Sequence, residues 1–111
     1  MPFLTIKTNG SSNDVKLVEK AANAVADVLR KPVNYVCAEI KYSSELAFAG
    51  SKQRIGAWIE LASIGFADRQ AVVDVLTDFA VENLNADKSL VCIRLIDLPA
   101  KDVAHGAVLF G

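Results

Sequence analysis

The chain has 111 residues, a formal net charge of −1 and a mean hydropathy of +0.30, and 52% of its residues are hydrophobic. This length suits one compact domain, and the chain has no basic block for binding nucleic acid. No apolar run reaches the roughly 18 residues that indicate a membrane span, and the N-terminus lacks the basic start and long apolar core of a signal peptide. We therefore expect one cytoplasmic domain, residues 1–111, that binds neither nucleic acid nor membrane.

The first half of the chain predicts a strand, a helix and a second strand. "FLTIKT" at 3–8 alternates as a strand does, and the turn "NGSSND" after it offers several helix N-caps, Asp14 among them. Apolar residues then recur at helical spacing through 15–30. The stripe consists of Val18, Ala21, Ala22, Val25, Val28 and Leu29. Lys31-Pro32 ends this helix, because the residue before a proline avoids helical geometry, and "NYVCAEIKY" at 34–42 follows as a strand.

The second half repeats this order. "AWIELASI" at 57–64 predicts a strand, and Asp68 in the turn "GFAD" is a good helix cap. A helix is expected through 69–84, and its apolar face consists of Val72, Leu76, Phe79, Ala80 and Leu84. "NADKS" breaks this helix before the strand "LVCIRLIDL" at 90–98. The tail "PAKDVAHGAVLFG" predicts short strands or a docking arm.

A nearly constant offset relates the two halves. Asp14 and Asp68 are 54 positions apart, and Val36-Cys37 and Val91-Cys92 are 55 positions apart. An offset maintained across turn, helix and strand indicates a duplicated β-α-β unit, with pseudo-repeat halves of about 1–55 and 56–111.

Two such units predict an α+β fold with a four-stranded mixed sheet and two helices on one face. β-α-β connections are right-handed and put both helices on the same side of the sheet. The runs "WIELASI" and "LVCIRLI" are nearly continuously apolar, which is typical of strands covered on both faces. Since the chain has no further helices for the second face, we expect other copies to cover it in a closed homo-oligomer.

The cysteines and the histidine give no sign of redox or metal chemistry. Cys37 and Cys92 are far apart and form no CxxC pair, so we expect two small buried hydrophobic residues. His105 is the only histidine, and a lone histidine cannot build a metal site. We expect neither a metal ion nor a cofactor.

Six stretches carry a resemblance that extends in order over nearly the whole chain. They are "PF" after Met1, "TN" after the first strand, "KPVNY", "LAFAGS", "SIG" and "DVAHGAVLF". Together they resemble the macrophage migration inhibitory factor family of the tautomerase superfamily. The resemblance implies a homotrimer whose sheets surround a central channel, with a pocket at each subunit interface.

The resemblance also implies a site for tautomerising phenylpyruvate-like α-keto acids. Its catalytic base is the N-terminal proline, which corresponds to Pro2 once Met1 is removed. If Met1 is retained, the Pro2 nitrogen is an amide and cannot act as a base. Lys31 corresponds to a lysine near the substrate carboxylate. The other matching pocket residues are Tyr35, Ile64, Val103 and Phe110.

Several positions depart from the family pattern. Cys92 occupies the position of an aromatic residue that a neighbouring subunit supplies in the family. Arg94 occupies the position of a pocket asparagine, and His105 that of a tryptophan. The planar guanidinium of Arg94 suits a second carboxylate, which favours a more acidic substrate. The CxxC of mammalian members is replaced at Ala57 and Glu60, so we expect no thiol oxidoreductase activity.

The chemistry requires a base that is free near neutral pH. An α-amine titrates about two pH units below lysine, and both an apolar pocket and a nearby cation lower its pKa further. Phe3, Ile64, Val103 and Phe110 are candidates for the apolar wall, and Lys31 for the cation.

Other interpretations remain for these residues and for the whole chain. Lys31 is equally suited to offsetting the negative end of the first helix, Tyr35 to packing and Arg94 to a surface ion pair. A cytokine-like homologue that binds a receptor, with a vestigial pocket, is the alternative function. A decarboxylase or dehalogenase that uses Pro2 with Arg94 is a third.

Overall fold

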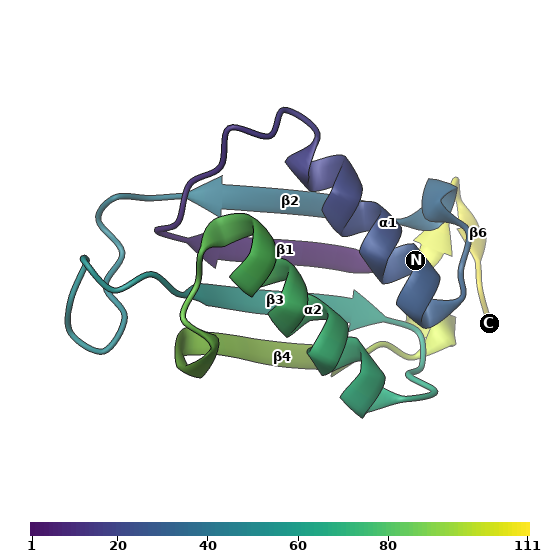
Figure 1. Cartoon of the computed structure of the whole chain (residues 1–111). Coiled ribbons are helices and arrows are strands. Elements are labelled where there is room, and N and C mark those ends of the chain that lie inside the picture. The colour runs from purple at the N-terminus through teal and green to yellow at the C-terminus, as the bar shows by residue number, and fades with distance from the viewer.

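The computed structural model describes all residues, 1–111, and the order strand–helix–3₁₀ turn–strand occurs twice in it (Figure 1). The first half contains β1 (Phe3–Thr8), α1 (Leu17–Leu29), η1 (Val33–Tyr35) and β2 (Cys37–Tyr42). The second half contains β3 (Ala57–Ser63), α2 (Arg69–Leu84), η2 (Lys88–Leu90) and β4 (Val91–Asp97). A short turn, η3 (Ala100–Asp102), then leads to a hairpin of β5 (Ala104–His105) and β6 (Val108–Leu109).

The sheet is mixed, with the strand order β2-β1-β3-β4. β1 runs parallel to β2, β3 runs parallel to β4, and the central pair β1 and β3 is antiparallel. This topology brings the start of β1, the end of β3 and the start of β2 to the same end of the sheet. Phe3 pairs there with both Cys37 and Ala62. The predicted four-stranded mixed sheet is confirmed.

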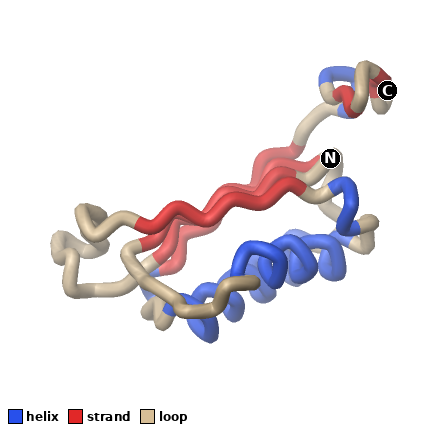
Figure 2. Tube along the Cα trace, turned by 90° about the horizontal axis from the view of Figure 1, so that it is seen from above, coloured by secondary structure: helices blue, strands red, loops and turns tan.

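Both helices cover the same face of this sheet, as predicted (Figure 2). The alternation of β1 and β3 points Leu4, Ile6, Ile59 and Leu61 toward the helices, where all four are 0% exposed. They pack with buried residues of α1 and α2 in one core. That core consists of Leu4, Ile6, Ala21, Val25, Ala57, Ile59, Leu61, Val72, Leu76, Phe79, Ala80, Leu84 and Ala86. Neither helix is long and apolar enough to cross a membrane.

The opposite face of the sheet is bare in the single chain (Figure 2). The expectation that Cys37 and Cys92 are buried is wrong for the single chain, because both are exposed free thiols. The strand alternation points them away from the helices, and Trp58, beside Cys92, is 42% exposed. The bare face also carries charge, since Glu60 and Arg94 face each other across β3 and β4 with a 3.6 Å ion pair.

The helix ends differ from the sequence-based expectations in two respects. Asp14 does not cap α1, because its side chain accepts from the amide of Lys16, the residue at the N-cap position, before the helix begins. α1 spans Leu17–Leu29 rather than 15–30, and it ends where Arg30 takes a left-handed conformation with φ 54°, one residue before Lys31-Pro32. In the second half, Asp68 caps α2 as predicted, accepting from the amide of Ala71.

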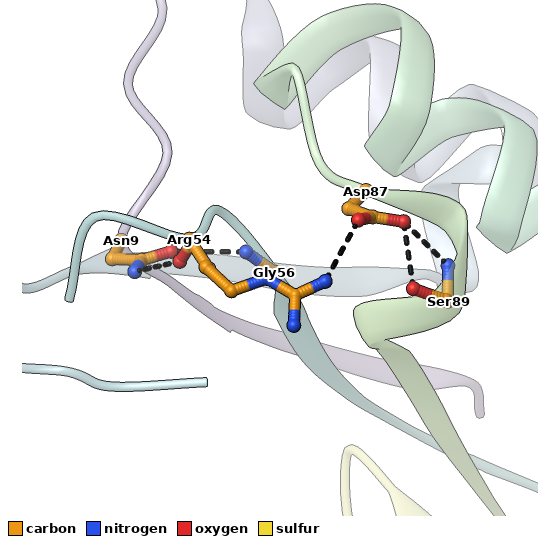
Figure 3. Close-up of polar contacts among 5 residues, drawn as sticks. All are labelled: Asn9, Arg54, Gly56, Asp87 and Ser89. Atoms are coloured by element: carbon orange, nitrogen blue, oxygen red, sulfur yellow. Dashed lines mark hydrogen bonds and ion pairs between the residues drawn. The ribbon is translucent and has the colours of Figure 1, made fainter. Parts of the chain in front are cut away.

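At the end of the sheet away from the N-terminus, side-chain hydrogen bonds hold the segment after β1 against the segment before β3 (Figure 3). Asn9 donates to the carbonyls of Leu46 and Arg54 at 3.0 and 2.7 Å, and its side-chain oxygen accepts from the amide of Gly56 at 3.0 Å. Arg54 reaches Asp87 at 3.2 Å. These contacts tie the end of β1 to the start of β3 and leave the other end of the sheet for the candidate site.

Candidate functional site

A cavity of about 280 Å³ lies where the start of β1 meets the end of β3. Segments far apart in the sequence form its wall: the N-terminus, the turn after α1, the turn after β3, and the tail. Its lining consists of Met1, Pro2, Lys31, Pro32, Tyr35, Ile64, Ala100 and Phe110. Five of the seven predicted site residues therefore come together: Pro2, Lys31, Tyr35, Ile64 and Phe110.

Pro2 is held at the head of β1. Its carbonyl accepts from the amide of Cys37 at 2.9 Å, which is the first hydrogen bond of the parallel pairing of β1 and β2. The side chain is almost completely buried, and Met1 lines the same cavity. With Met1 present, the free amine of the chain belongs to Met1. Burial lowers the pKa of that amine below its usual value, and the positive charge of Lys31 lowers it further.

Lys31 extends from the end of α1 to the end of β3. The left-handed Arg30 reverses the chain, and the amide of Lys31 bonds back to the carbonyl of Ala26 at 3.0 Å. Its ammonium donates to Ser63 Oγ at 2.8 Å and to the carbonyl of Ile64 at 3.0 Å. No carboxylate pairs with Lys31. Its charge at the cavity is thus held by neutral oxygens and is not cancelled.

Three hydrogen bonds hold the backbone of the turn after β3. The carbonyl of Ser63 accepts from the amide of Leu98 at 2.8 Å, and the amide of Gly65 donates to Asp97 at 3.0 Å. Gly65 has φ +76°, a conformation that residues with a side chain rarely adopt. Lys31 supplies the third contact, through Ile64. Ile64 therefore lies in a turn whose backbone is anchored to β4 and to α1.

The tail supplies an aromatic wall. Phe110 lines the cavity, and its amide donates to the carbonyl of Val103 at 3.0 Å. Val103 does not line the cavity in the single chain. Its carbonyl holds the backbone of Phe110, which does. Tyr35 meets His105 edge-on, with ring centroids 5.3 Å apart, and both rings line a second hollow beside the hairpin.

Arg94 and Cys92 are not brought to this cavity in the single chain. They lie on the bare face of the sheet, where Arg94 pairs with Glu60 and its side chain is 65% exposed. Phe3 also faces that side and is 46% exposed. The sequence reasoning missed Ser63, Pro32 and Ala100. The motif "SIG" indicates Ile64 only, although the side chain of the buried serine before it also contacts Lys31.

The largest cavity, of about 610 Å³, lies on the helix side of the sheet. It runs between the end of α1 and the start of α2, with Leu29, Phe66 and Val72 among its apolar lining. Lys31 and Ile64 border both cavities, but Pro2 borders only the smaller one. We take the smaller cavity as the candidate site because it brings the N-terminal residues and the Lys31 cation to one largely apolar wall, whereas the larger one does not reach Pro2.

The comparison with family models matches the macrophage migration inhibitory factor family over residues 1–111. The chain belongs to this family, within the tautomerase superfamily. The family member from Trichinella spiralis has a similar structure, with a TM-score of 0.84, 26% identity and coverage of 97% of this chain and 99% of that one.

Two further members of the macrophage migration inhibitory factor family share the fold. The protein from Toxoplasma gondii gives a TM-score of 0.81 at 24% identity, covering 97% of this chain and 99% of that one. The protein from Oncomelania hupensis gives 0.88 at 21% identity, covering 100% of this chain and 83% of that one. A comparison with curated proteins finds no match.

Proposed function

We propose that this member of the macrophage migration inhibitory factor family is an isomerase. It interconverts the keto and enol forms of phenylpyruvate-like α-keto acids, with Pro2 as general base after removal of Met1. The observation that carries the proposal is the meeting of Pro2 with an uncancelled Lys31 charge in one largely apolar cavity. Burial and the charge of Lys31, which lower the pKa of the Met1 amine, also favour the unprotonated form of a secondary amine at this position.

In the proposed reaction, the Pro2 nitrogen takes a proton from the carbon next to the keto group. The electron pair of that C–H bond forms a carbon–carbon double bond, the π electrons of the keto group move to its oxygen, and the protonated Pro2 nitrogen returns the proton to that oxygen to give the enol. The reaction is an isomerisation and needs no oxidant or reductant. Lys31 attracts the substrate carboxylate and stabilises negative charge that develops during the proton transfer. Tyr35, Ile64 and Phe110 contact the aromatic part of the substrate.

We also propose that the working form is a homotrimer. The bare sheet face and the exposed apolar hairpin, in which Val108 and Leu109 are 68% and 60% exposed, both favour association with further copies. A cavity of about 280 Å³ is also small for a ligand site. A neighbouring subunit adds wall to it, and in that assembly Arg94 and Cys92 of one chain face the pocket of another.

The experiment is a spectrophotometric assay of phenylpyruvate keto–enol conversion, with protein whose intact mass shows that Met1 is absent. The matched control is the same protein with an N-terminal extension, in which the Pro2 nitrogen remains an amide. We expect turnover by the first and a loss of at least about 100-fold in the second, as for the loss of a general base. Equal rates would refute the role of Pro2. Partner binding that persists without turnover would favour the cytokine-like alternative.

A further inference from the structure

Ser63 has no role in the chemistry proposed above, yet its hydroxyl is the nearest neighbour of the Lys31 ammonium. The Nζ–Oγ distance is 2.8 Å, against 3.0 Å to the carbonyl of Ile64. Ser63 is the last residue of β3, is 0% exposed, and points to the helix side of the sheet. A buried hydroxyl at this position has a fixed direction, because both its backbone and its surroundings are fixed.

The backbone of Ser63 is held independently of Lys31. Its carbonyl accepts from the amide of Leu98 at 2.8 Å, and two residues later the amide of Gly65 donates to Asp97 at 3.0 Å. Lys31, in contrast, follows a helix end and carries a flexible four-carbon side chain. The hydroxyl of Ser63 and the carbonyl of Ile64 are therefore the fixed points to which that side chain is tied.

The neutrality of these acceptors matters. A carboxylate in place of Ser63 would hold the ammonium in the same place but would also neutralise it. A hydroxyl and a carbonyl hold it and leave the positive charge for a substrate anion. An ammonium has three N–H donors, so two bonds to the protein leave one for a ligand.

We propose that Ser63 is a positioning residue that fixes the Lys31 ammonium for the carboxylate of the substrate. This inference rests on the proposed function and adds to it a residue that acts through Lys31. Its specific consequence is that loss of the Ser63 hydroxyl costs a substrate with a carboxylate more than a substrate without one.

The kinetic test compares two substrates in protein that lacks Met1: phenylpyruvate and its methyl ester, which has no carboxylate. For Ser63→Ala we expect KM for the acid to rise about tenfold, as for a lost hydrogen bond to a charged group. The loss of kcat/KM should be smaller for the ester, because the ester engages Lys31 only through the charge that develops during the proton transfer. Ser63→Cys keeps a side chain of similar shape, but its larger sulfur accepts only weakly, so the same loss is expected. Ser44→Ala, an exposed serine in the loop after β2, is the control.

A double substitution strengthens this test. In a Lys31→Met background, Ser63→Ala should change the kinetics for the acid no further, because the group that Ser63 positions is gone. Equal losses for acid and ester, or a full effect of Ser63→Ala without Lys31, would overturn the proposal and leave Ser63 a merely structural residue.

A second measurement does not depend on turnover. Nitrogen-15 relaxation of the lysine ammonium groups reports how rigidly each is held. We expect Lys31 to be more ordered than the exposed Lys52, and to move toward the mobility of Lys52 in Ser63→Ala. Unchanged order of Lys31 would overturn the proposal. If the unmodified protein turns over neither substrate, the proposed function fails, and the relaxation data still decide whether Ser63 holds Lys31.

Discussion

Replacement of Asn9 by alanine removes the side-chain hydrogen bonds at the end of the sheet away from the candidate site. Its side chain is 7% exposed and makes three hydrogen bonds, to the carbonyls of Leu46 and Arg54 and to the amide of Gly56. At about 1 kcal/mol for each bond, Asn9→Ala should lower the free energy of unfolding by about 3 kcal/mol. With an m-value of about 1.5 kcal/mol per M, the urea midpoint should fall by about 2 M.

The assay is equilibrium urea unfolding followed by circular dichroism. All variants are compared at one protein concentration, because association of subunits would add to the apparent stability. Asn13→Ala, in the exposed turn after β1, is the matched control and should leave the midpoint unchanged. Asn9→Asp provides a second check, since it replaces a donor to two carbonyls with a carboxylate, and its loss should be at least as large.

A midpoint shift below about 0.5 M for Asn9→Ala would refute this reasoning. It would mean that water replaces the lost side chain at little cost, and that the hydrogen bonds of Asn9 contribute little to the net stability. Tautomerase turnover should be retained in the folded variant, because Asn9 lies at the other end of the sheet from Pro2.

Three further predictions concern charge and assembly. Lys31→Met should lower kcat/KM for an α-keto acid by about 10- to 100-fold, and it should raise the pKa of the N-terminal amine, so that the acid limb of the pH–rate profile moves to higher pH. Hydrogen bonds from Ser89 and the neighbouring Arg54 lower the pKa of Asp87, so this carboxylate adds stability above about pH 4 that is lost as the pH falls through its lowered pKa. The difference in Tm between the unmodified protein and Asp87→Asn should therefore shrink from about pH 6 to about pH 2. Light scattering of the purified protein should give about three times the chain mass of 11.9 kDa, and the mass of one chain would refute the trimer.

The fold could be predicted from the sequence because its signals are local and repeated. Alternation in β1 and β3, helical stripes in α1 and α2 and a constant offset between the halves all point to the same arrangement. The bare face was harder to interpret. The nearly continuous apolar run "LVCIRLI" predicts a strand covered on both faces, whereas in the single chain Arg94 forms an ion pair with Glu60 on the bare face and Cys92 is exposed. A period-2 pattern tells which residues share a face, but not whether another chain covers it.

The candidate site was predictable only where the sequence resembles a known family. Pro2 and Lys31 carry no local signal that separates a base and a cation from a strand start and a helix end. The resemblance selected them, and the structure brings them into one cavity. The sequence does not indicate Ser63, because its contact with Lys31 depends on the left-handed turn at Arg30, which directs Lys31 toward the end of β3. No spacing in the sequence encodes that contact.

The repeated architecture explains why only one end of the sheet carries the site. Arg30 and Asn85 end the two helices in the same left-handed conformation, with φ 54° and φ 56°. The next residue is Lys31 in the first half and Ala86, which is 5% exposed, in the second. The backbone therefore turns in the same way after both helices, but only the first half has a cation at the position that follows the turn. At the other end Asn9 forms hydrogen bonds within the protein, so that end serves stability, whereas Lys31 keeps a charge that the protein does not neutralise.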